Sequence, residues 1–133
     1  MKKKWLKIAL TSILAVGALV PVASAANYKF HFDVTTNFLT GRAYTNYAWK
    51  FTDKENPVVK ITSIDSNWTA GVRMENSEGA KRSSNLYTKK AGNYTLTNNG
   101  AKASYKYRLK IWKEKGGKFD RFTMKGKWNP DTY

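Results

Sequence analysis

Residues 103–115 read ASYKYRLKIWKEK, and the alternation in this stretch decides the fold class. Every second side chain from Ala103 to Ile111 is apolar or aromatic, and nearly every side chain between them is cationic. A period of two residues is typical of a β-strand that has one buried face and one exposed face. The stretch therefore predicts a strand whose exposed face is strongly basic.

The same period recurs along the chain after residue 25. It predicts strands at 28–34, 43–51, 58–64 and 70–74, and more weakly at 86–88. Turn-forming segments separate these runs, and no helical period is found among them. We therefore expect an all-β domain, a small antiparallel β-sandwich or barrel of about seven or eight strands.

Two glycine-containing turns suggest how the C-terminal strands pair. Asn99-Gly100 and Gly116-Gly117 both favour two-residue hairpin turns. The two registers agree, and they predict a three-stranded meander with one shared core face. The expected members of that core face are Tyr94, Leu96, Ala103, Tyr105, Tyr107, Leu109, Ile111, Phe122, Met124 and Trp128.

The opposite face of this meander would collect basic side chains. It would set Arg108 across from Lys125 and Lys106 across from Lys127, and like charges in that position repel. A bound anion would relieve the repulsion, and Trp112 suits a stacking contact at the edge. The alternative is a solvated face, because salt screens exposed charges. The predicted anion-binding residues are Lys102, Lys106, Arg108, Lys110, Arg121, Lys125, Lys127 and Trp112.

The first 25 residues carry the pattern of a secretory signal peptide. Lysines precede an apolar stretch from Ile8 to Val20, and Ala23-Ser24-Ala25 follows as a cleavage site. The apolar run is short for a membrane span of about 20 residues, and no later stretch is suited to one. We expect a single β-domain over 26–133, secreted and either extracellular or associated with the cell wall.

Charge points to polyanionic partners. The formal net charge is +15, and the mature chain would keep 20 of the 24 Lys and Arg residues and all 9 acidic ones, about +11. That sign favours anionic cell-wall polymer or an anionic lipid surface, and less strongly nucleic acid. The alternative is that the charge only keeps the protein soluble.

Catalytic chemistry finds little support in the sequence. His31 is the one histidine and cysteine is absent, so the common zinc sites cannot be built. A Ser-His-Asp triad would have to use His31, and no serine lies in a G-x-S-x-G motif. The sequence therefore predicts a non-enzymatic protein with no cofactor and no metal. Trp49 and Trp68 are candidates for a core stack or, if exposed, for sugar stacking.

The chain ends in Gly126-Lys127-Trp128-Asn129-Pro130-Asp131-Thr132, and Trp49-Lys50 lies in a predicted strand. With the signal peptide and the cysteine-free β pattern, these motifs resemble a family of small secreted proteins from Bacillus-like Gram-positive bacteria, catalogued as a domain of unknown function. The resemblance implies export and a small β-domain, and it supplies no activity and no functional residues.

Three hypotheses follow. The first is a secreted, non-enzymatic basic β-domain that binds anionic cell-envelope material through its Lys/Arg-rich sheet face. The second is a secreted antimicrobial, bacteriocin-like protein that acts on target membranes. The third is a structural or interaction protein whose charge confers solubility.

Overall fold

The computed structural model describes residues 26–65, 68–114 and 121–133. The predicted signal peptide and the Gly116-Gly117 turn lie outside these described residues. Within the described part of the chain, no helix is long and apolar enough to cross a membrane.

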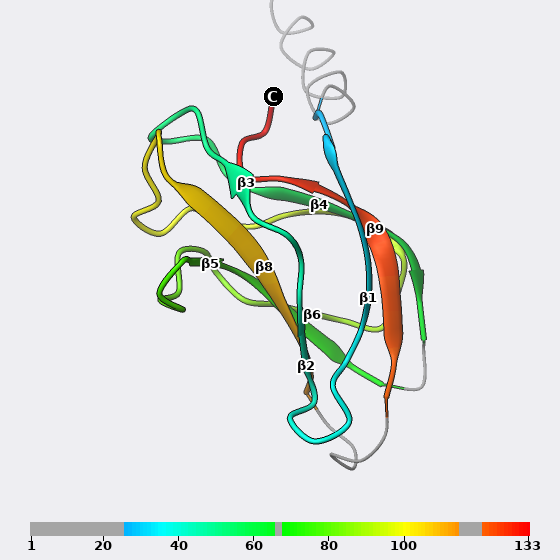
Figure 1. Cartoon of the computed structure of the whole chain (residues 1–133). Coiled ribbons are helices and arrows are strands. Elements are labelled where there is room, and N and C mark those ends of the chain that lie inside the picture. Colours follow the sequence, from blue (N-terminus) through cyan, green and yellow to red (C-terminus); the bar gives the residue numbers. More distant parts are fainter. Residues whose placement is uncertain (1–25, 66–67, 115–120) are drawn as a thin grey trace, which may run out of the picture.

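The chain forms two antiparallel sheets that face each other as a sandwich (Figure 1), which confirms the all-β prediction. Sheet A has the strand order β1-β9-β4-β7, and sheet B has the order β2-β8-β5-β6, with β3 also paired to β8. The strands are β1 (Phe30–Thr35), β2 (Arg42–Tyr44), β3 (Ala48–Trp49), β4 (Val58–Ile64), β5 (Ala70–Asn76), β6 (Leu86–Thr88), β7 (Gly92–Thr95), β8 (Lys106–Lys113) and β9 (Thr123–Asn129).

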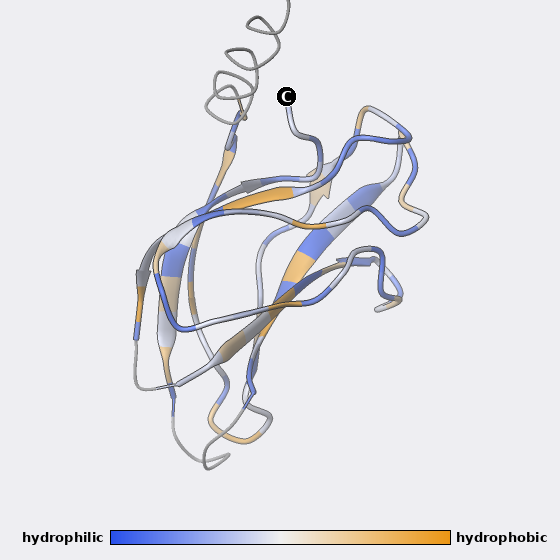
Figure 2. Ribbon diagram, turned by 180° about the vertical axis from the view of Figure 1, so that it is seen from behind, coloured by the Kyte–Doolittle hydropathy of each residue, from blue (hydrophilic) through white to orange (hydrophobic). Residues whose placement is uncertain are grey.

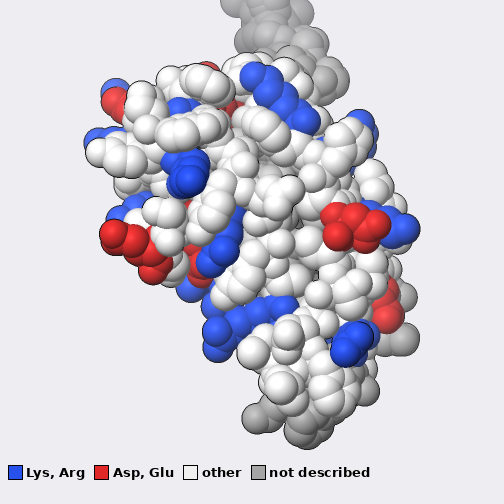
Figure 3. All heavy atoms as spheres, in the orientation of Figure 1, with Lys and Arg blue, Asp and Glu red and all other residues white. Residues whose placement is uncertain are grey.

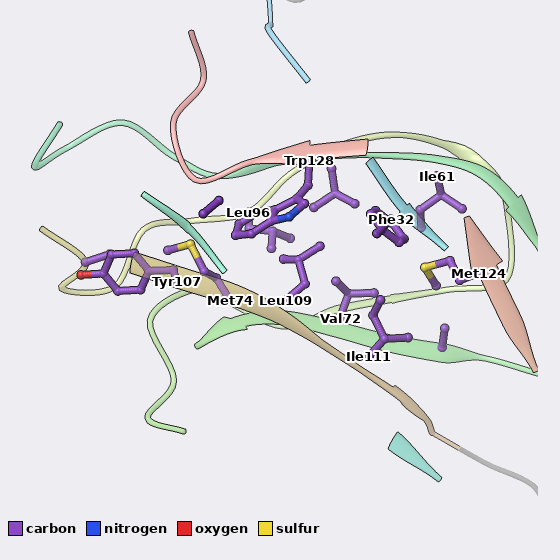
Figure 4. Packing of buried hydrophobic residues seen from close by; sticks show 14 of the residues in the cluster. Phe32, Ile61, Val72, Met74, Leu96, Tyr107, Leu109, Ile111, Met124 and Trp128 are labelled. Atoms are coloured by element: carbon purple, nitrogen blue, oxygen red, sulfur yellow. The ribbon is translucent and has the colours of Figure 1, made fainter. Parts of the chain in front are cut away.

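The hydrophobic core lies between the two sheets. Alternate residues of each strand point inward, so the apolar positions of both sheets meet in one cluster. Blue and orange segments alternate along β8 (Figure 2), as its sequence predicts. Figure 4 shows the labelled core side chains, to which sheet A contributes Phe32, Ile61, Met124 and Trp128 and sheet B contributes Val72, Met74, Leu109 and Ile111.

The predicted C-terminal meander is wrong, because β8 and β9 belong to different sheets. On β8, Ile111 pairs with Val72 and Ala43, and on β9, Met124 pairs with Val34 and Ile64. Both strands are central, so each already has neighbours on its two sides. The alternation determines which side chains of a strand point inward. It does not determine the partner, because any strand whose inward positions line up could pair equally well.

The Asn99-Gly100 turn does not form the predicted hairpin either. Gly100 adopts a positive φ, but the chain after it enters a loop, while β7 pairs with β4. Most of the expected core residues are nevertheless buried. Tyr105 is the clear error, since it is 63% exposed in that loop.

The predicted strand at 43–51 is interrupted. Ala43 and Thr45 point inward as expected, but the phase then reverses, so that Ala48 and Lys50 are buried and Trp49 is exposed. Thr45 explains the break, because its amide donates to the carbonyl of Leu109 while its hydroxyl accepts from the Leu109 amide. The predicted core position of Trp49 is therefore wrong.

A buried ion pair ties the C-terminal segment to the chain after β3. Lys50 is fully buried, and its Nζ donates to Oδ1 of Asp131 at 3.0 Å. The same ammonium donates to the carbonyl oxygens of Glu55 and Pro130, each at 2.7 Å. The Trp49-Lys50 and Pro130-Asp131 motifs thus meet in space, and they stabilise the fold together.

Candidate anion-binding surface

The outer face of sheet B combines cations with aromatic rings. Its central strand β8 presents Lys106, Arg108, Lys110 and Trp112 outward, as the sequence predicts for these four residues. Neighbouring strands add outward side chains at matching positions of the register. We call this surface the sheet B face, and it consists of Arg42, Tyr44, Trp49, Arg73, Glu75, Tyr87, Lys106, Arg108, Lys110 and Trp112.

Arg108 is held between aromatic rings. Its guanidinium carbon lies 3.9 Å from the ring centroid of Tyr44 and 5.1 Å from that of Tyr47. Glu75 is directly across from it on β5, but that carboxylate accepts two hydrogen bonds from Arg73, at 2.8 and 2.6 Å. Among the residues that the structure describes, the buried Nε of Arg108 has no hydrogen-bond acceptor. Stacking therefore fixes this cation without neutralising it.

Trp112 lies flat on the sheet because its neighbour on β5 is a glycine. A Cβ at Gly71 would overlap with the indole ring of Trp112. The ring of Tyr87 meets the indole edge-on at a centroid distance of 6.0 Å. The indole Nε1 donates to Glu114 at 2.9 Å. Trp112 is thus a positioned aromatic platform, with Lys110 5.5 Å from its centroid.

Burial and neighbouring cations both affect the amine of Lys110. Burial lowers the pKa of this amine, and the nearby cations of Arg73 and Arg42 lower it further, while Glu75 partly opposes them. A bound anion would favour the charged ammonium and relieve the repulsion. The part of the lowering that comes from Arg73 and Arg42 is the part that a bound anion would offset.

The other predicted residues lie elsewhere, so the single basic face is wrong. On the outer face of sheet A, Lys125 pairs across from Asp33, and Lys127 lies between His31 and Lys60. Arg121 precedes β9, and its guanidinium lies 5.4 Å from the ring centroid of Phe38. Lys102 is in the loop after the Asn99-Gly100 turn. The predicted facing pairs of Arg108 with Lys125 and Lys106 with Lys127 do not exist.

Arg42, Arg73 and the aromatic residues of the face other than Trp112 were not among the predicted anion-binding residues. The alternation of the predicted strand at 70–74 places Arg73 on its polar side. Nothing in the sequence shows that this strand neighbours β8. Figure 3 shows blue side chains among uncharged ones over the side of the molecule where β8, β3 and β2 lie, with red side chains beside them toward β5. Across the described residues, no group of three His, Cys, Asp or Glu side chains could hold a metal ion.

The chain was compared with models of known protein families and with curated proteins, and neither comparison produced a match.

Proposed function

We propose that the protein is a secreted, non-enzymatic domain that binds anionic polymer of the cell envelope through the sheet B face. The observation that carries the proposal is the charge imbalance of that face. Its strands present several Lys and Arg side chains but one acid, Glu75, which is already paired with Arg73, and Glu114 just after the end of β8 adds one more carboxylate beside Trp112. A polyanion would supply the missing negative charge.

The shape of the face suits an extended ligand. Neighbouring strands of a sheet are spaced about 4.8 Å apart, and alternate residues along a strand lie about 6.8 Å apart. This spacing offers a grid of charges rather than one enclosed site. Tyr44 and Tyr47 keep Arg108 ordered, so little side-chain entropy would be lost on binding. A flexible wall polymer with repeating phosphates can follow such a grid.

Binding to isolated cell walls should depend steeply on salt. We expect the amount of protein that co-sediments with walls to fall at least tenfold between about 0.05 M and about 0.5 M NaCl, because salt screens exposed charges and competes for the polymer. Walls stripped of their phosphate polymers are the control and should retain little protein at either salt concentration. Equal retention at both salt concentrations would contradict the proposal.

A second candidate function is membrane binding by a bacteriocin-like protein, and one turn favours it. Phe38 and Leu39 are 42% and 66% exposed at the tip between β1 and β2. The Oδ1 of Asn37 accepts hydrogen bonds from the amides of Leu39 and Thr40, at 2.7 and 3.1 Å, which fixes the turn. With Arg121 beside Phe38, the tip has the chemistry of an interfacial anchor for anionic lipid.

Vesicle binding tests this second candidate. If it holds, anionic phosphatidylglycerol vesicles should release trapped dye with the wild type, and the double substitution Phe38→Asp/Leu39→Asp should abolish release because it removes the apolar tip. Phe51→Asp is the matched control, since Phe51 is 71% exposed at another site. No release by the wild type, or equal loss with Phe51→Asp, would reject the candidate.

A further inference from the structure

A cleft of about 490 Å³ adjoins the sheet B face. It lies where β3 and the start of β8 meet the turn after β5 and the loop that follows Gly100. The side chains on which the argument depends are Trp49, Arg82, Lys102, Ser104, Tyr105 and Lys106. Two of these, Lys102 and Lys106, were predicted from the sequence as anion-binding residues.

The cleft brings cations and exposed aromatic rings together. Trp49 is 54% exposed and Tyr105 is 63% exposed, and both offer a large aromatic ring to the solvent. Trp49 is directly across from Lys106 in the pairing of β3 with β8. Arg82 and Lys102 add positive charge, and Glu78 is the acid among the lining residues. The cleft is therefore net positive and has stacking surfaces.

The loop that carries Lys102 and Tyr105 is fixed in place. Ser104 has a φ of 72°, the left-handed conformation that side-chain-bearing residues seldom adopt. Its amide donates to the carbonyl of Lys50 at 2.8 Å, and the Lys50 amide donates to the carbonyl of Tyr105 at 2.9 Å. The Lys102 amide donates to the Tyr107 hydroxyl at 2.8 Å. Strained backbone that is held this firmly is typical of ligand sites.

The hydrogen bonds that fix this loop connect it to the buried ion pair. Lys50, whose backbone bonds to both Ser104 and Tyr105, is the residue whose ammonium pairs with Asp131. The amide of Ala103 also donates to Oδ1 of Asp53, at 2.9 Å. The cleft is thus preformed, and a ligand would not have to order the loop on binding.

We propose that this cleft binds one anionic sugar unit, a monosaccharide that carries phosphate or carboxylate. The sugar ring lies against Trp49 or Tyr105, and its anionic group meets Lys102 and Lys106. Asn76, Ser77 and Ser104 also line the cleft, and their amide and hydroxyl groups match a ring that carries many hydroxyls. This inference rests on the proposed function, because it assigns the repeating unit of the polymer that the neighbouring face binds.

Titration followed by NMR tests the assignment. Glucose 6-phosphate and glucuronate are added to the ¹⁵N-labelled protein, with glucose, inorganic phosphate and adenosine monophosphate as comparators. We expect saturable shifts of the Trp49 indole N–H and of the Ser104 and Lys106 amides, with an anionic sugar binding at least fivefold more tightly than glucose or phosphate. The two anionic sugars distinguish phosphate from carboxylate. The assignment would be overturned if inorganic phosphate bound as tightly as the anionic sugars, or if adenosine monophosphate bound more tightly than they do.

Two variants complete the experiment. Trp49→Ala and Tyr105→Ala should fold, because both side chains are exposed, and at least one should weaken binding of the anionic sugar fivefold or more. Phe51→Ala, at an exposed aromatic outside both the cleft lining and the sheet B face, is the matched control and should bind normally. If the protein binds walls in a salt-dependent way but no sugar shifts the NMR signals of the cleft residues, the sugar assignment is wrong and the proposed function stands. If walls do not bind, the proposed function fails.

Discussion

Replacing Asp131 with alanine is expected to lower the free energy of unfolding by about 3–5 kcal/mol, because it leaves the Lys50 ammonium buried without its counter-charge. The carboxylate also accepts hydrogen bonds from the amides of Phe51 and Thr52, at 2.8 and 3.2 Å, and from the Thr52 hydroxyl at 2.7 Å. These donors lose their partner in the same variant. Urea unfolding measures the change.

Asp33→Ala is the matched control for this experiment. Asp33 is also an acid that faces a lysine, but it is exposed on β1 and faces Lys125 across the sheet. Exposed pairs contribute at most about 1 kcal/mol. If Asp131→Ala were as stable as Asp33→Ala, the buried pair would not hold the C-terminal segment in place.

Acid should destabilise the protein in part through the same carboxyl. Burial raises the pKa of Asp131, but the hydrogen bonds from Phe51, Thr52 and Lys50 outweigh it and bring the pKa below the ordinary value. A carboxyl whose pKa is depressed in the folded state stabilises the fold above the unfolded-state pKa of about 3.9 and loses that effect as pH falls through the folded-state value. Stability should therefore decline below about pH 4, and less steeply in Asp131→Asn.

Gly126→Ala is expected to destabilise the protein by about 3 kcal/mol, at the upper end of the range for overpacking. A Cβ at position 126 would overlap with the backbone carbonyl oxygen of Lys60, and it would lie 3.0 Å from the ring of Phe32. The backbone of β4 cannot move away without breaking its pairing with β9, which crosses a register shift between Ile61 and Ser63.

Gly71→Ala separates this backbone clash from the general effect of adding a methyl group. At Gly71 the new Cβ would meet the indole ring of Trp112, a surface side chain that can swing away. We expect a loss of about 1 kcal/mol for this variant, together with a change in Trp112 fluorescence. Denaturation of both variants by urea provides the comparison, and equal losses would contradict the assigned role of Gly126.

The sequence predicted the fold class and most side-chain orientations, but not the strand partners. On β8, Tyr107, Leu109 and Ile111 are buried as their alternation indicates. The predicted pairing of β8 with β9 is wrong because the two strands belong to different sheets. Strands with the same alternating pattern are equally suitable as neighbours of β8. The choice among them is made by contacts between residues that are distant in sequence.

The sequence predicted which residues of each strand are exposed, but not which strands lie side by side in the candidate site. Lys106, Arg108 and Lys110 were assigned to an exposed face correctly, whereas Arg42 and Arg73 joined them through pairings that no local pattern encodes. The C-terminal motif has a structural explanation. Trp128 fills the core, and Asp131 neutralises Lys50. The side chain of Asn129 donates to the carbonyl of Asn27 and accepts from the amide of Asp131.

The most direct test compares charge reversal on the two outer faces. Arg42→Glu/Lys106→Glu alters the sheet B face, and Lys29→Glu/Lys127→Glu alters the sheet A side by the same net charge. Both variants are assayed for binding to isolated walls at low salt. We predict that the sheet B variant loses affinity at least tenfold while the sheet A variant changes by less than about threefold. Equal losses would show that net charge alone drives binding, and would contradict an assigned face.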